Sequence, residues 1–243
     1  MTVHAFELNA LGQKIGLEVP AWTKRPLPPA TPMVGRFCRV ELLDAGRHAA
    51  DLFAANRLDT EGRNWTYLPY GPFERLADYR AWVESVTAHS DPLFHAIVDL
   101  ATGKAVGIAS LMRIDAAMGV IETGHLNYSP LLQRTPVATE AMFLLMRRVF
   151  DELGYRRYEW KCHGLNEPSQ ATALRLGFSY EGCFRQAVVT KGRNRDTLWY
   201  SIIDREWPGI KRAYATWLAP DNFDAAGLQR RSLAMLIAEV RLA

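Results

Sequence analysis

Apolar and polar residues alternate along several stretches of this chain, and the alternation predicts strands. In residues 155–163, YRRYEWKCH, the side chains of Tyr158, Trp160 and Cys162 alternate with charged side chains, which is the period-two pattern of a half-buried strand. Residues 45–58 instead repeat their apolar positions at helical spacing, and Asp44 can cap this helix. The two periodicities therefore predict a chain that mixes strands with helices.

The expected elements follow the order β-α-α-β-β-β-α-β-α-β-β. A further helix is expected from Val137 to Leu153, where Gly154 provides a C-cap. The remaining helices are expected at 74–89 and 167–176, and the remaining strands at 35–44, 93–100, 104–114, 119–128, 178–190 and 196–204. The last two strands form a hairpin around the turn KGRNRD at 191–196. Three antiparallel strands followed by a β-α-β-α unit predict an α/β fold, with a mixed, mostly antiparallel sheet of about seven strands and helices on both faces.

The two ends of the chain differ from its middle. Residues 20–32, PAWTKRPLPPATP, contain five prolines, which no helix or central strand tolerates, so an extended connection is expected there. Residues 1–34 are accordingly predicted to be an N-terminal extension, 35–207 the domain, and 208–243 a helical extension packed on it.

Composition narrows the class of protein. The chain has 243 residues, of which 49% are apolar and 23% charged, as in soluble globular proteins. A formal net charge of +3 gives no reason to expect nucleic acid or a membrane surface as partner. Three cysteines without a CxxC pair indicate reduced thiols and no metal site. The N-terminus lacks a basic start followed by an apolar core, so a cytoplasmic protein is expected, and a homodimer is left open.

The turn QRTPVAT at 133–139 is the first candidate site. Thr135 is a good N-cap and Pro136 suits the first helical position, so the next amides lack an intrahelical partner. Such amides attract an anion like a pyrophosphate, although a capped helix end that binds only water has the same pattern. The residues involved would be Gln133 and Arg134 through their side chains, and Val137, Ala138 and Thr139 through their amides.

Several motifs resemble the GCN5-related N-acetyltransferase (GNAT) superfamily. The family has a Gln/Arg-x-x-Gly-x-Gly/Ala turn, whose first and last positions are matched by Gln133 and Ala138, whereas Pro136 replaces the inner glycine. The strand VIETGHLNYSP resembles that of the ribosomal-protein N-terminal (alanine) acetyltransferase-like branch. The segments LGYRRYEWKCHGLNEPSQATALRLGFSYEGCFRQ and GRNRDTLWYSIIDREWP resemble later parts of the same branch. The resemblance covers residues 35–207.

This resemblance implies an acetyl-CoA-dependent N-acetyltransferase. The acetyl group would pass to a primary amine, on a peptide or protein N-terminus or a small molecule, by direct attack in a ternary complex. By family position, the cofactor contacts would be His125, Leu126, Asn127, Gln133, Arg134, Thr135, Val137, Ala138, Thr139, Asn166, Ser169, Ala173 and Phe178. An oxyanion donor is expected among the amides of 125–127.

The resemblance also suggests catalytic roles, each beside a structural alternative. An amine with a pKa near 10 must lose a proton before attack, and Glu122 is the candidate base, directly or through water. The alternative is a glutamate that faces solvent, and His125 is a weaker candidate that packing would explain. Ser169 is the candidate acid for the leaving thiolate, or only bonds the backbone of its helix. Tyr128 is a second candidate acid or only a core residue, while Cys162 is expected to be a buried apolar residue.

The acceptor side is expected in two loops. Trp65, Tyr67 and Tyr70 could wall a substrate pocket or only anchor their loop. The charged residues of the predicted turn, Arg193, Arg195 and Asp196, could contact a carboxylate or phosphate, or belong to a solvated turn. If the arginines face the site, repulsion disfavours a polyamine acceptor.

Two other functions fit the same residues. A non-catalytic protein could keep the fold and bind acyl-CoA as a sensor or interaction module. An acetyltransferase could also use a hydroxyl group as its acceptor.

Overall fold

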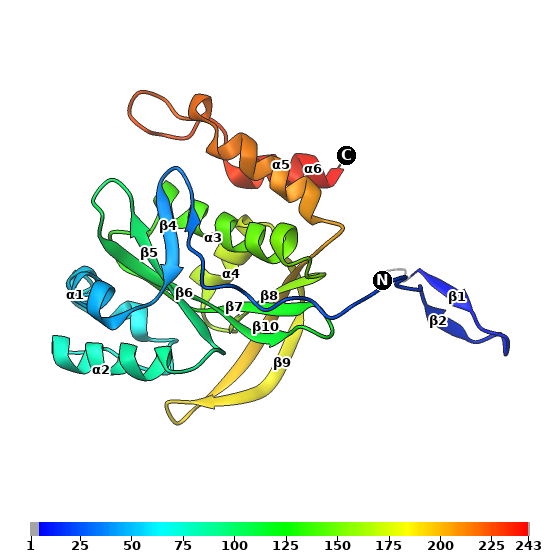
Figure 1. Cartoon of the computed structure of the whole chain (residues 1–243), viewed down its shortest axis with the longest axis horizontal. Coiled ribbons are helices and arrows are strands. Elements are labelled where there is room, and N and C mark those ends of the chain that lie inside the picture. Colours follow the sequence, from blue (N-terminus) through cyan, green and yellow to red (C-terminus); the bar gives the residue numbers. More distant parts are fainter. Residues whose placement is uncertain (1–4, 243) are drawn as a thin grey trace.

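An eight-stranded sheet forms the centre of the protein (Figure 1). The computed structural model describes residues 5–242. The strand order is β3-β4-β5-β6-β7-β8-β10-β9, and every neighbouring pair is antiparallel except β7 and β8. The strands are β3 Met33–Val34, β4 Cys38–Leu42, β5 Leu93–Asp99, β6 Ala105–Asp115, β7 Val120–Tyr128, β8 Arg157–His163, β9 Ser179–Thr190 and β10 Arg193–Ile203. The predicted mixed, mostly antiparallel sheet is confirmed, and the two-residue strand β3 extends it by one.

Helices cover both faces of this sheet, as predicted (Figure 1). The helices are α1 Ala45–Asn56, α2 Leu76–Thr87, α3 Pro136–Arg147, α4 Glu167–Arg175, α5 Trp207–Leu218 and α6 Leu233–Leu242. Short turns lie at η1 Arg63–Trp65, η2 Arg148–Glu152 and η3 Pro220–Asn222. On one face, Leu52 and Val83 of α1 and α2 join a core with Phe94 and Ile108 of the sheet. The other face carries the larger core, to which α3, α5 and α6 contribute.

The predicted caps explain where two helices begin and end. The Asp44 carboxylate accepts a hydrogen bond from the Arg47 amide at 2.8 Å, which fixes the start of α1. The helix predicted at 137–153 is regular only to Arg147 and continues as the π-helical turn η2. Gly154 follows with φ of +67°, a left-handed conformation that suits glycine after a helix.

The predicted hairpin is confirmed, but its turn is shorter than the predicted 191–196. Arg193 pairs with Thr190 across the hairpin, so Arg193–Asp196 belong to strand β10. The turn itself consists of Lys191 and Gly192, both with positive φ, and two such residues match the twist of a tight hairpin. Arg195 and Asp196 are therefore held by a strand and are not part of a flexible, solvated loop.

The N-terminal segment is anchored to the domain at several points between Trp22 and Thr31. The Trp22 indole donates to the Ala117 carbonyl at 2.8 Å and packs over Gly119, where a Cβ atom would lie only 2.5 Å from the ring. Before this anchor, strands β1 Phe6–Leu8 and β2 Lys14–Gly16 form an exposed hairpin that projects away from the domain (Figure 1). The sequence pattern did not predict this hairpin.

Residues beyond the predicted domain limits of 35 and 207 also belong to the sheet and to the core. Strand β3 already pairs with β4, and α5 begins at Trp207. Ile210, Leu236 and Ile237 contribute side chains to the larger core. Residues 1–4 and 243 of the two predicted extensions lie outside the described residues.

Candidate functional site

Strands β7 and β8 pair over only part of their length. Their parallel pairing runs from Val120 opposite Arg157 to Thr123 opposite Trp160, although β7 continues to Tyr128. On its other side, β7 stays paired with β6 as far as Tyr128. Within the described chain, the β7 backbone at 124–128 therefore has no strand partner on the side of β8, and such an edge can pair with an extended ligand.

A β-bulge interrupts β7 along this edge. Ser110 lies opposite Gly124 and Ile108 opposite Asn127, so β7 has an additional residue at this point. His125 has φ of +50°, an unfavourable conformation for a residue with a side chain. The Ser110 hydroxyl donates to the Gly124 carbonyl at 3.0 Å and helps to hold the bulge. Bulges redirect backbone groups, and this one coincides with the segment predicted to supply an oxyanion donor.

Helix α3 starts close to the end of β7 along the chain. The Thr135 hydroxyl accepts from the Ala138 amide at 3.3 Å, so the predicted N-cap is present and one of the predicted amides is already satisfied. Thr139 is buried, and its hydroxyl accepts from the Arg175 guanidinium of α4 at 3.3 Å. A cation beside the positive end of a helix strengthens the attraction for anions. Sequence reasoning missed Arg175 because it belongs to another helix.

The two residues before the cap are used differently. The Gln133 side-chain amide donates to the Asn64 side chain at 2.8 Å and to the Tyr128 carbonyl at 2.7 Å. It therefore joins the end of β7 to the loop that contains η1. Arg134 is exposed and has φ of +61°. That either side chain contacts a cofactor stays a prediction.

Glu122 is buried in a chain of ion pairs. Its Oε2 atom lies 2.8 Å from Lys161 Nζ and 2.8 Å from the Arg113 guanidinium, and its side chain is 5% exposed. Lys161 also lies 2.8 Å from Glu159 and 3.6 Å above the Trp199 ring centroid. The alternative of a solvent-facing glutamate is therefore wrong. Both cations contact Oε2, which leaves Oε1 as the oxygen with capacity for a further hydrogen bond.

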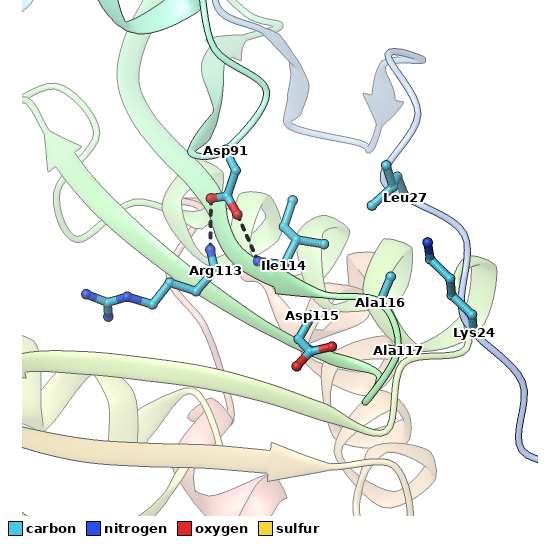
Figure 2. A pocket seen from close by; sticks show the side chains of 8 residues that line it. All are labelled: Lys24, Leu27, Asp91, Arg113, Ile114, Asp115, Ala116 and Ala117. Carbon is cyan, nitrogen blue, oxygen red and sulfur yellow. Dashed lines mark hydrogen bonds between the residues drawn. The ribbon is translucent and has the colours of Figure 1, made fainter.

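Asp91 holds Arg113 in position for this contact. Its carboxylate accepts hydrogen bonds from the amides of Arg113 and Ile114 at 2.9 and 3.0 Å (Figure 2). The side chain of Arg113 extends away from the shallow hollow that Figure 2 shows. That hollow is lined by Lys24, Leu27, Asp91, Arg113, Ile114, Asp115, Ala116 and Ala117, and contains none of the predicted site residues.

Ser169 is oriented by a tryptophan. The Trp160 indole donates to Ser169 Oγ at 3.0 Å, and because an indole nitrogen can only donate, the serine oxygen is the acceptor. The hydroxyl proton of Ser169 thus points to another acceptor, and the Cys162 sulfur is one such group nearby. Asn166 caps α4 by accepting from the Ser169 amide at 3.3 Å. Burial raises the pKa of the neighbouring Cys162 thiol, so this residue is the expected buried apolar one.

The His125 ring packs among aromatic side chains. Its Nδ1 atom lies 3.2 Å from the Tyr70 hydroxyl, and the ring contacts Tyr70 and Phe94. Burial, together with the charges of Arg113 and Arg195, lowers the pKa of His125 to about 4, so the ring is neutral at pH 7. The preferred interpretation, packing, is confirmed by these contacts.

The other predicted acid and two predicted cofactor contacts lie deeper. The Tyr128 hydroxyl is buried without a hydrogen-bond partner among the described residues, and burial raises its pKa. Ala173 and Phe178 are 0% exposed and belong to the larger core, so their side chains serve in packing. Leu126 is partly buried against the same core. The low exposure of Ala173, Phe178 and Leu126 gives no support for contacts with a cofactor, and these contacts stay predictions.

The loop at 57–75 connects the elements around the free edge. The Tyr67 hydroxyl donates to the Leu165 carbonyl at 2.9 Å, just after β8. Trp65 is buried and packs against neighbouring aromatic rings, so the anchoring alternative is correct for this residue. The carbonyl of Trp65 accepts from Lys191 at the tip of the β9–β10 hairpin at 2.8 Å. The loop therefore spans from the end of β7 to the hairpin.

Comparison with known proteins identifies the family to which this arrangement of strands and helices belongs. The model of the acetyltransferase (GNAT) domain matches residues 39–179. The chain belongs to the GNAT acetyltransferase family. A GCN5-related N-acetyltransferase from Brucella melitensis is 48% identical, with a TM-score of 0.88, over 90% of this chain and 100% of that chain. A GNAT-family structure from Chromobacterium violaceum is 40% identical, with a TM-score of 0.74, over 80% of this chain and 96% of that chain.

A curated GNAT relative and a more distant structure add detail. YdaF of Bacillus subtilis, which is named for ribosomal N-acetyltransferases, is 30% identical over 109 residues, and the match spans 45% of this chain and 59% of that relative. The acetyltransferase MccE, solved in complex with acetyl-CoA and AMP, is 23% identical with a TM-score of 0.62, over 72% of this chain and 98% of that chain, and shares the fold. The predicted superfamily is confirmed.

Two further findings concern the part of the chain that the structure describes. Among residues 5–242, no helix is long and apolar enough to cross a membrane. In the same residues, no cluster of three or more histidine, cysteine, aspartate or glutamate side chains is arranged to hold a metal ion.

Proposed function

We propose that this GNAT protein transfers the acetyl group of acetyl-CoA to a primary amine, on a peptide or protein N-terminus or on a small molecule. The observation that carries the proposal is the unpaired β7 edge at 124–128, followed closely along the chain by the N-terminus of α3. Glu122 precedes the edge on β7, and Ser169 of α4 contacts Trp160 of β8, so groups that can exchange protons flank the place where the two strands separate.

The residues present fit acetyl-CoA, which supplies the acetyl thioester when bound. Its pantetheine arm contains amides that can pair with the free β7 edge as an additional strand would. The first-turn amides of α3 and the Arg175 guanidinium are suited to its phosphates. Asn127 is 1% exposed, and its side-chain amide has no partner among the described residues, which leaves a polar group available beside the edge.

Glu122 is proposed as the proton acceptor for the amine. An alkyl ammonium group with a pKa near 10 must be deprotonated before it can attack, and Oε1 of Glu122 is free of the two cations that hold Oε2. A water molecule could relay the proton. His125 is the weaker candidate, since a ring with a pKa of about 4 binds a proton poorly at pH 7.

Ser169 is proposed as the group that protonates or hydrogen-bonds the leaving thiolate. Trp160 occupies an acceptor position of the serine oxygen, so the hydroxyl proton can be donated elsewhere. Serine-to-alanine substitution should therefore lower kcat by roughly a hundredfold, in the range for loss of a positioned acid. Thr172→Ala, on the same helix, removes a hydroxyl that only bonds the Pro168 carbonyl and should leave kcat unchanged.

The direct test is thiol release from acetyl-CoA with a panel of amines and matched alcohols. The proposal predicts release that depends on an amine, with the acetylated amine detected by mass spectrometry. Release that depends only on alcohols would assign the protein to hydroxyl transfer. Tight CoA binding by calorimetry without release for any acceptor would instead support a sensor or interaction module.

A further inference from the structure

The sheet face that carries Glu122 is lined by ion pairs. Glu122 contacts Arg113 and Lys161, and Lys161 also contacts Glu159. The series continues from Glu159 to Arg157 and from Arg157 to Glu181, with N–O distances of 2.6 Å. Each buried charge in this series therefore has a partner of opposite sign, which is the condition for burying charges at low cost.

Arg195 lies on the same side and lacks such a partner. Its Nε atom donates to the Thr197 hydroxyl at 3.2 Å, which places both side chains on one face of β10. The side chain is partly buried, yet no carboxylate of residues 5–242 forms a salt bridge with it. Burial lowers the pKa of Arg195, as expected for a guanidinium without a counter-ion. Its terminal nitrogens are thus available to an anion.

The neighbours of Arg195 place it on the side of the sheet from which the acceptor amine would approach. On the same face, Lys161, which holds Glu122, lies opposite Trp199, four residues from Arg195 along β10. The charge of Arg195 also helps to lower the pKa of His125 in the β7 bulge. Two residues along the strand, Thr197 lies opposite His163, whose ring contacts Tyr67 of the 57–75 loop. Arg195 therefore lies where the loop, the hairpin and the free edge meet.

The phosphates of CoA are not a good explanation for this cation. Ile121 and Tyr158 point into the core beneath α3, so their neighbours Glu122 and Glu159 point to the opposite face of the sheet. The proposed phosphate site is at α3 and Arg175. An anion bound by Arg195 would instead lie with Glu122, on the face that an acceptor must approach.

We propose that the acceptor carries a carboxylate or phosphate close to its amine, and that Arg195 binds this group through its guanidinium fork. The inference rests on the proposed acetyl transfer and adds the class of substrate. A guanidinium fork matches the two oxygens of either anion. The same positive charge disfavours polyamines.

Matched acceptors test this substrate class. One set comprises peptides with a free N-terminal alanine followed by glutamate, phosphoserine, glutamine or lysine, and a second pair is phosphoethanolamine and ethanolamine. We expect the anionic member to have a kcat/KM at least about tenfold higher, as for a charge-assisted contact. Arg195→Gln should abolish this ratio whatever it does to the overall rate. Arg205→Gln, which removes an exposed arginine just beyond the end of the same strand, should retain it.

The outcomes separate this inference from the function on which it rests. Equal use of neutral and anionic acceptors, or a preference that persists in Arg195→Gln, would overturn the anion site and leave acetyl transfer intact. If no probe is acetylated, the proposed function fails. Calorimetry of the same peptides with the CoA complex then decides the anion site without turnover: tighter binding of acidic peptides, lost in Arg195→Gln, supports it, and equal binding refutes it.

Discussion

Replacing Thr139 by aspartate would place a carboxylate where the phosphates are proposed to bind. Thr139 is in the first turn of α3, and its hydroxyl lies 3.3 Å from the Arg175 guanidinium. The new carboxylate would pair with Arg175 and with the positive helix end. Because Thr139 is buried, the new carboxylate loses hydration, which Arg175 and the positive helix end offset, so the fold should be retained with some loss of stability.

The loss of CoA affinity can be estimated from Coulomb's law. For two unit charges about 5 Å apart and an effective dielectric constant of about 20, the repulsion is about 3 kcal/mol. This corresponds to a dissociation constant more than about a hundredfold higher. Pairing of the new carboxylate with Arg175 takes this cation away from the phosphates but also weakens the repulsion, so these two effects oppose each other.

Calorimetric titration of CoA into Thr139→Asp and Thr139→Asn provides the comparison. The two side chains have nearly the same shape and differ in charge, so only the aspartate should lose affinity by the estimated factor. Thermal unfolding of both proteins checks that the fold is intact. Equal CoA affinities for the two variants, whether both are high or both are low, would refute a phosphate site at this helix end.

Three other outcomes follow from buried polar groups. Glu122→Gln should lower kcat strongly in a thiol-release assay. Glu159→Gln removes the other carboxylate that contacts Lys161 and should not lower kcat. Equal rates for the two variants would exclude Glu122 as the base. Glu140→Gln should cost about 3 kcal/mol in urea unfolding, because the charged carboxylate accepts from three backbone amides; a loss near zero would contradict that role. Burial lowers the pKa of both His95 and His125 to about 4, so the unfolded chain binds more protons than the folded one between about pH 6.5 and 4. The urea concentration at the midpoint of unfolding should therefore fall as the pH is lowered through this window. A midpoint that does not change with pH in this range would contradict the reasoning.

Local patterns in the sequence were sufficient for most of the fold. Alternation in 157–163 identified both the strand and its buried face, because side chains on a strand point to opposite sides. Asp44 and Gly154 marked helix ends through their own hydrogen-bonding and conformational preferences. The hairpin turn was misplaced because charged residues such as Arg193 and Arg195 are typical of turns, although cross-strand pairing kept them in β10.

The partners of the site residues could not be read in the same way. Glu122 contacts Lys161 because β7 and β8 lie side by side in one particular register, and no local pattern specifies that register. Arg175 reaches Thr139 from another helix for a similar reason. The site assignments, the cytoplasmic location and the homodimer stay predictions.

Amide hydrogen exchange of the full chain, with and without saturating CoA, tests the central claim most directly. If the cofactor lies along the free β7 edge with its phosphates at α3, exchange should slow at the amides of 124–128 and 137–139. These two segments should respond together, since one ligand contacts both. Unchanged exchange in both segments at a CoA concentration that saturates binding, with protection elsewhere such as around Asp91 and Ile114, would contradict the proposed site.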